Sequence, residues 1–113
     1  MSEDFRAATA QELALLEYLV RAPGAPAQGL LPQLQGIEAK ADCTCGCPSV
    51  ALRPQQGVPA ADEASLEITA GCPGGILVLF VREGRLASLE LACLDSVMAQ
   101  WPALEVVTPP SAS

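Results

Sequence analysis

Apolar residues near the N-terminus recur with the period of an α-helix. The stretch "LALLEYLVRA" places them on one stripe and its margin, at Leu13, Leu15, Leu16, Leu19 and Val20. The preceding Thr9-Ala10-Gln11-Glu12 matches the capping box, in which the threonine and glutamate side chains complete the hydrogen bonds of the first turn. Pro23-Gly24 ends the pattern, so the sequence predicts a helix over residues 9–22. The next stretch, "APAQGLLPQLQG", predicts a short second helix that carries Leu30, Leu31 and Leu34.

From Ile37 onward the pattern changes to the two-residue period of a β-strand. One face of this strand is apolar and consists of Ile37, Ala39, Ala41, Cys43 and Cys45. The following "SVALR" predicts a second strand with Val50 and Leu52 facing inward. Because the inward positions change from odd to even numbers, Gly46-Cys47-Pro48 is either a turn between two strands or a bulge in one long strand.

Three further strands are predicted at 64–70, 75–81 and 85–93, and Glu83-Gly84 fits a two-residue hairpin loop between the last two. Regular pairing from this loop gives one wholly apolar face, which we expect to pack on the helices: Ile76, Val78, Phe80, Leu89, Leu91 and Cys93. The reverse face then carries Leu77, Leu79, Val81 and Leu86. An exposed surface that is this apolar favours a binding partner.

The elements together predict an α+β domain, with one or two N-terminal helices packed on a mostly antiparallel sheet of four or five strands in meander order. The chain has 113 residues, which is the size of one domain with its own core. We expect the domain to span residues 1–107. Residues 108–113, "TPPSAS", are predicted to form a disordered tail.

The net charge of the chain limits which classes of binding partner are expected. Thirteen acidic residues stand against six basic ones, for a formal net charge of -7. An acidic surface repels phosphate, so nucleic acid and anionic membranes are excluded as expected partners, and a basic protein or a cation is favoured. No run reaches the roughly 18 apolar residues of a membrane span, and "MSEDFRAAT" lacks the features of a secretory signal. We therefore expect a cytoplasmic protein.

Five cysteines are the main candidates for chemistry: Cys43, Cys45, Cys47, Cys72 and Cys93. In a meander, the similar Gly-Cys-Pro turns at 46–48 and 71–73 fall at the same end of the sheet, and the last strand ends there too. Thiolates bind zinc or a soft metal, with Cys45, Cys47 and Cys72 as ligands and Cys43 or Cys93 as a fourth. The spacing is not that of common zinc modules, however, and the chain has no histidine.

Two other uses of the cysteines stay open. A redox role needs a lowered thiol pKa, and no basic residue lies near Cys47 or Cys72 in the sequence. Cysteine also serves as a small buried hydrophobic residue. We expect this last use, because Cys43 and Cys45 fall on the apolar face of their strand.

Catalytic patterns are weak. Without histidine the chain lacks the commonest general base, and "GCPGG" lacks the lysine and hydroxyl residue of a phosphate-binding loop. Trp101, before Pro102, is either an anchor for a partner or a side chain that closes one edge of the core. The sequence thus favours a non-enzymatic protein.

The stretches "CTCGCPSVAL", "GILVLFVREGRLASLELACLDS" and "WP" resemble a group of small bacterial proteins without an established activity. The group shares an N-terminal leucine-rich helical segment, a Cys-Gly-Cys motif before a strand, and a hairpin of the form V-x-x-G-R-L-x-x-L-E, here Val81–Glu90. By analogy with other small acidic proteins, the resemblance suggests an immunity-type inhibitor of a basic toxin.

The most consistent hypothesis is therefore a small acidic binding module. Its partner is a basic protein or a second copy of the chain, held through Leu77, Leu79, Leu86 and Trp101. The alternative is a zinc or soft-metal domain that uses the five cysteines.

Overall fold

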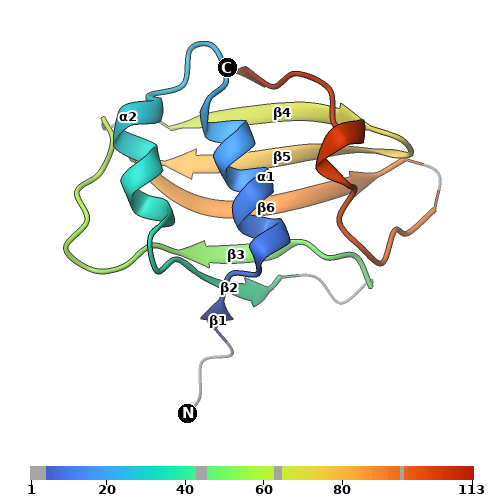
Figure 1. Cartoon of the computed structure of the whole chain (residues 1–113), viewed down its shortest axis with the longest axis horizontal. Coiled ribbons are helices and arrows are strands. Elements are labelled where there is room, and N and C mark those ends of the chain that lie inside the picture. The colour runs from blue at the N-terminus through green and yellow to red at the C-terminus, as the bar shows by residue number, and fades with distance from the viewer. Residues whose placement is uncertain (1–4, 43–45, 63–64, 95) are drawn as a thin grey trace.

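A computed structural model of the chain describes residues 5–42, 46–62, 65–94 and 96–113. It has two layers: a seven-stranded antiparallel sheet, and helices that lie in front of it in Figure 1. The C-terminal segment, red in Figure 1, lies on the same side as the helices. The predicted α+β class is confirmed, with more strands than the four or five expected.

The helical segments lie mainly before the strands in the chain, with five consecutive strands from β2 to β6. The helical ones are α1 (Ala10–Val20), α2 (Ala27–Leu30) and two 3-10 helices, η1 (Leu31–Leu34) and η2 (Leu104–Val106). The strands are β1 (Arg6–Ala7), β2 (Glu38–Ala41), β3 (Val50–Arg53), β4 (Leu66–Cys72), β5 (Gly75–Arg82), β6 (Arg85–Cys93) and β7 (Ser111–Ala112).

The N-terminal helix forms as its pattern predicts. The Thr9 hydroxyl accepts a hydrogen bond from the Glu12 backbone N–H, and the Glu12 carboxylate accepts one from the Thr9 N–H, which completes the capping box. The apolar stripe of α1 is buried against the sheet through Leu15, Leu16, Leu19 and Val20. The predicted second helix is the pair α2 and η1, with Pro32 in the first turn of η1, where proline needs no hydrogen-bond partner.

The strand order is β1-β2-β3-β6-β5-β4-β7, which differs from the predicted meander. After β3 the chain crosses to the far side of the sheet and returns through β4 and β5, so β6 lies beside β3. The physical reason is the length of β6, which has nine residues. At an edge its backbone groups would lack partners along one side, whereas here it is paired along part of both.

The ambiguity at Gly46-Cys47-Pro48 is decided by the pairing of its neighbours. β2 and β3 run antiparallel, with Ala41 opposite Val50. These residues therefore belong to a connection between two strands and not to a bulge in one long strand. Cys43 and Cys45, predicted to extend the apolar face of the first strand, lie outside the described residues.

The β5–β6 hairpin corrects the predicted faces. Its loop is as predicted, with positive φ at Glu83 (51°) and Gly84 (80°), the signature of a type I′ turn. Val81 pairs with Leu86, but Phe80 then pairs with Ser88, so Ala87 is an extra residue in β6. A bulge of one residue reverses every following side chain relative to the partner strand.

The inward face of β5 is consequently the one predicted to be exposed. Leu77 and Leu79 are 0% exposed and Leu86 is 2% exposed. The prediction that Leu77, Leu79 and Leu86 form an exposed partner-binding or dimer face is therefore wrong, because these side chains belong to the chain's own core. Ile76, Val78 and Phe80 lie on the opposite face of the sheet.

The C-terminal residues join the sheet, where a disordered tail was predicted. Ser111 and Ala112 form β7 beside β4, and Ser113 exchanges two backbone hydrogen bonds with Glu67. The Thr108 N–H also donates to the Gly71 carbonyl. The tail is ordered because β4 would otherwise be an open edge with unpaired backbone groups.

Candidate functional site

The three described cysteines lie at one end of the sheet, the end opposite the Glu83-Gly84 turn. Cys72, at the end of β4, pairs with Gly75, and Gly75 pairs with Cys93 at the end of β6. Cys47, in the β2–β3 connection, lines a pocket together with Cys93. The structure thus brings Cys47, Cys72 and Cys93 to the same region, which we call the cysteine end.

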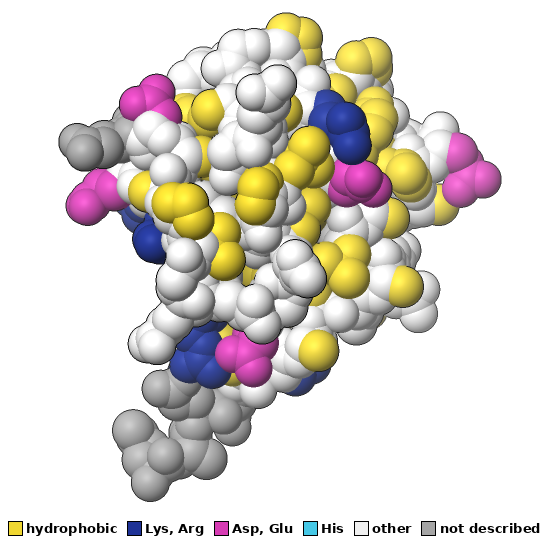
Figure 2. Space-filling view, turned by 60° about the vertical axis from the view of Figure 1, so that its left-hand side comes forward, with side chains coloured by type: hydrophobic (Ala, Val, Ile, Leu, Met, Phe, Trp, Pro, Cys, Tyr) yellow, Lys and Arg dark blue, Asp and Glu magenta, His cyan; other side chains and the backbone are white. Residues whose placement is uncertain are grey.

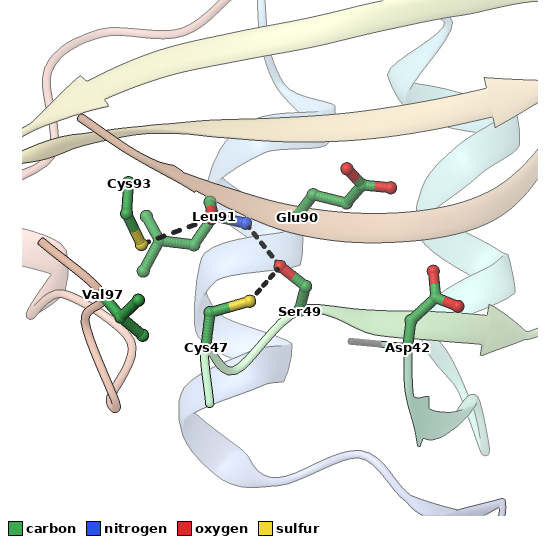
Figure 3. A pocket seen from close by; sticks show the side chains of 7 residues that line it. All are labelled: Asp42, Cys47, Ser49, Glu90, Leu91, Cys93 and Val97. Carbon is green, nitrogen blue, oxygen red and sulfur yellow. Dashed lines mark hydrogen bonds between the residues drawn. The ribbon is translucent and has the colours of Figure 1, made fainter. Parts of the chain in front are cut away.

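A pocket opens at this end because β3 and β6 separate. They pair only through Val50 and Ala51. Beyond these residues, a side-chain hydrogen bond from Ser49 takes the place of backbone pairing between β3 and β6. The Ser49 hydroxyl accepts from the Leu91 N–H at 2.9 Å and from the Cys47 thiol at 3.4 Å (Figure 3). The resulting pocket has a volume of about 410 Å³ and is lined by Asp42, Cys47, Ser49, Glu90, Leu91, Cys93 and Val97.

A second sulfur-bearing group lies beside the pocket. Cys72 and Cys93 flank Gly75, and the Met98 sulfur lies 3.5 Å from the position that a Cβ on Gly75 would occupy. The Met98 N–H donates to the Cys93 sulfur at 3.4 Å. All three side chains are half-buried against the core. Burial raises the pKa of the Cys72 thiol, and the neighbouring Cys93 raises it further.

The described residues offer no ligand set of the kind predicted for zinc. Within them, no three cysteine, aspartate or glutamate side chains are arranged to hold a metal ion. The predicted set also uses Cys43 and Cys45, which lie outside the described residues, so the five-cysteine metal site stays a prediction.

The face of the sheet opposite the helices carries a strip of apolar side chains. This outer strip consists of Ile76, Val78 and Phe80 on β5, and Ile76 is 37% exposed. Glu67 on β4 pairs with Phe80, and Glu90 on β6 pairs with Val78. A carboxylate therefore flanks the strip on each side, and the Arg82 guanidinium lies 5.6 Å from the Phe80 ring centre at one end.

Charged side chains are sparse on another side of the molecule. Figure 2 shows basic groups lying beside acidic ones there, with hydrophobic atoms exposed between these charged groups. On that side, the net negative charge of the chain is not gathered into one acidic patch.

Trp101 closes the core and does not present an exposed anchor. Its side chain is 9% exposed, and its Nε1 donates to the Glu12 carboxylate at 3.2 Å. Arg6 also pairs with Glu12, at 2.8 Å. Burial acts to raise the pKa of Glu12, but the hydrogen bonds from Arg6, Thr9 and Trp101 outweigh it and lower that pKa to about 2. Of the two roles considered for Trp101, the structure supports the one in the core.

Two parts of this arrangement were missed from sequence. Met98 follows the last strand in a stretch without periodicity, and only the glycine pair Gly74-Gly75, which leaves room for its sulfur, signals its place. The outer strip was assigned to the wrong face by the regular register.

Comparison with known proteins does not assign the chain to a family. No protein-family model, no curated protein and no solved structure matches the chain. The resemblance to small bacterial proteins stays a prediction. Among the described helices, none is long and apolar enough to cross a membrane.

Proposed function

We propose that the protein is a non-enzymatic binding module that docks a basic protein on the outer strip. The observation that carries the proposal is the face of the sheet opposite the helices: Ile76, Val78 and Phe80 lie in a row there, and no described helix covers them. Apolar side chains with charged neighbours are typical of a protein interface.

The edges of the sheet favour docking on its face. The edge strands, β1 and β7, have two residues each. A partner that added a strand to the sheet would find few backbone groups to pair with at either edge. The face is the larger surface with apolar side chains.

Charge decides which kind of partner is expected. Glu67 and Glu90 flank the outer strip, and the chain has a net charge of -7. A partner with basic residues around an apolar centre would be complementary to this arrangement. An inhibitor of a basic protein is the concrete form of this proposal, in line with the analogy drawn from sequence.

The test uses a photoreactive amino acid at Val78 on the outer strip, with Glu17 on the exposed side of α1 as the control position. In the native host, we expect a cross-link from position 78 to a protein with a basic surface, and none from position 17. Equal cross-linking at both positions, no cross-link at 78, or a cross-link to a second copy of the chain would each contradict the proposal.

The purified partner then allows a matched pair of variants. Val78→Lys and Ala14→Lys each add one positive charge, on the outer strip and on α1 respectively. By calorimetry we expect Val78→Lys to weaken binding by about tenfold or more, the size of a central interface residue. Ala14→Lys should leave affinity within about twofold, since it lies off the interface. The same loss in both variants would refute docking on the outer strip.

A further inference from the structure

The pocket between β3 and β6 opens beside the outer strip. Glu90 lines the pocket, and it also pairs directly with Val78 of the strip. Directly paired residues of antiparallel strands project to the same face of the sheet, so the Glu90 side chain borders both the pocket and the strip. An ordinary protein interface covers about 800 Å² on each partner, which is more than three side chains provide. A partner docked on the outer strip therefore reaches the pocket.

The two carboxylates of the pocket are not paired with a cation in the described part of the chain. Asp42 and Glu90 lie at one end of the pocket (Figure 3). Neither of them belongs to an ion pair with a described arginine or lysine. Lys40, two residues before Asp42, is directed to the Phe5 ring, with its Nζ 5.7 Å from the ring centre. The pocket thus holds two negative charges that a positively charged group from outside would neutralise.

The rest of the lining is less polar and is held in place by the protein itself. The Ser49 hydroxyl accepts hydrogen bonds from the Leu91 N–H and the Cys47 thiol, and the Cys93 thiol donates to the Leu91 carbonyl. Leu91 and Val97 add apolar side chains, and Val97 is 56% exposed, so the apolar wall extends to the rim. The volume of about 410 Å³ exceeds the roughly 300 Å³ at which small-ligand pockets begin.

From this arrangement we infer that the pocket receives an arginine side chain of the docked basic partner, an inference that rests on the proposed docking function. The planar guanidinium carries five N–H donors, which suit two carboxylates, and the aliphatic stem of arginine suits the apolar wall. A lysine ammonium is a more strongly hydrated point charge and fits such a lining less well. A metal ion is disfavoured, because no three cysteine, aspartate or glutamate side chains of the described residues are arranged to hold one.

The first test uses a capped arginine, Nα-acetylarginine methylamide, and does not need the partner. In isotope-labelled protein, NMR titration at millimolar ligand should give saturable shifts of the Ser49, Glu90 and Leu91 amides. Capped citrulline has nearly the same shape without the charge, and it should bind at least about tenfold more weakly. Capped lysine should also bind more weakly. No saturable shift at these amides, or equal binding of citrulline or lysine, would overturn the inference.

Matched variants separate the pocket from the general acidity of the chain. Asp42→Asn and Glu90→Gln each remove one negative charge with little change in shape, and each should weaken binding of capped arginine by about fivefold or more. Glu83→Gln removes the same charge from an exposed position at the opposite end of the β5–β6 hairpin. It should leave the affinity within about twofold, because salt screens a charge at that distance. An equal loss in all three variants would overturn the inference.

The pocket and the docking surface can fail separately. A cross-link from position 78 to a basic partner, without binding of capped arginine, would support docking on the outer strip and overturn the arginine pocket. Binding of capped arginine without that cross-link would contradict docking on the outer strip, and with it the partner as the source of the arginine. With the partner in hand, Asp42→Asn should weaken the complex by about fivefold or more, and an unchanged affinity would overturn the inference.

Discussion

The two ends of the sheet are built differently. At the Glu83-Gly84 end, the fully buried side chain of Gln33 donates to the Gly84 carbonyl at 2.8 Å and accepts from the Leu86 N–H at 2.9 Å. The Ala61 N–H also donates to Gly84, so the 59–62 loop closes over the turn. At the cysteine end the strands separate, a pocket opens, and Leu94 and Val97 are 65% and 56% exposed.

The two ends of the sheet contribute differently: one mainly stabilises the fold, and the other exposes side chains that could bind a ligand. The Glu83-Gly84 end, which we call the closed end, joins neutral side-chain and backbone groups at short distances, and these bonds fix the hairpin. The cysteine end leaves thiols, a thioether and carboxylates within reach of solvent, and relies on a few polar contacts to stay folded. A site for a ligand or ion needs such accessible groups on a rigid frame, and the closed end helps to provide that frame.

The largest effect is expected at the closed end, from Gly84→Ala. Gly84 has a φ of 80°, and a Cβ there would overlap the Asp62 carbonyl oxygen. Because the obstacle is backbone, the 59–62 loop must move and lose its bond to the turn. We expect the free energy of unfolding in urea to fall by about 3 kcal/mol or more.

Gly57→Ala is the matched control for this variant. Gly57 has a similar φ of 91°, but nothing lies within 4 Å of its added Cβ. Only the backbone strain remains, about 1 kcal/mol. If both variants lost the same stability, the closed end would not be tightly packed, and the contrast between the two ends would fail.

The same turn shows what the sequence could predict. Glu83-Gly84 is a local signal, because a type I′ turn needs positive φ at two adjacent residues and glycine allows it. The bulge at Ala87 has no such signal: "RLASLEL" reads equally well with either register. One unpaired residue then changed the inward face of β5, so the outer strip could not be found from periodicity.

Long-range order was similarly out of reach. The crossing from β3 to β4 and the addition of β7 depend on which backbone edges need partners, which no short stretch encodes. At the candidate site, the shared Gly-Cys-Pro turns correctly brought Cys47 and Cys72 to the end where β6 finishes. Met98 was not predicted, because its place depends on the loop after β6 folding back over Gly75.

The second prediction concerns the contribution of the buried Glu12 carboxylate, near the cysteine end, to the stability of the fold. Glu12 is 2% exposed, and its pKa of about 2 lies below the ordinary value of 4.5. The folded state therefore binds this proton less readily than the unfolded state. The resulting stability is fully present above about pH 4.5 and is lost as the pH falls toward 2. Glu12→Gln should cost about 2 to 3 kcal/mol at pH 7, and the difference from the unchanged protein should shrink across that window.

Glu17→Gln is the control for charge loss on the same helix. Glu17 pairs with Arg21 at 3.3 Å, but both side chains are 58% exposed. We expect a change below about 0.5 kcal/mol at any pH. Urea unfolding of both variants between pH 2 and 7 checks this. A Glu12→Gln deficit that does not depend on pH would mean that the charge of Glu12 does not stabilise this end.

The smallest loss of stability is expected from removing a serine hydroxyl that accepts a hydrogen bond from a backbone N–H. One such bond lies at each end of the sheet. The Ser49 hydroxyl accepts from the buried N–H of Leu91 at the cysteine end, and the Ser65 hydroxyl accepts from the exposed N–H of Glu83 at the closed end. Water can replace Ser65 but not Ser49. Ser49→Ala should therefore cost about 1 to 2 kcal/mol, and Ser65→Ala less than about 0.5 kcal/mol. In hydrogen exchange, Ser49→Ala should also speed exchange of the Leu91 amide, since β3 no longer reaches β6 there. If both serine variants lost the same stability, water would reach the Leu91 N–H as easily as the Glu83 N–H. The pocket at the cysteine end would then not be shielded from solvent.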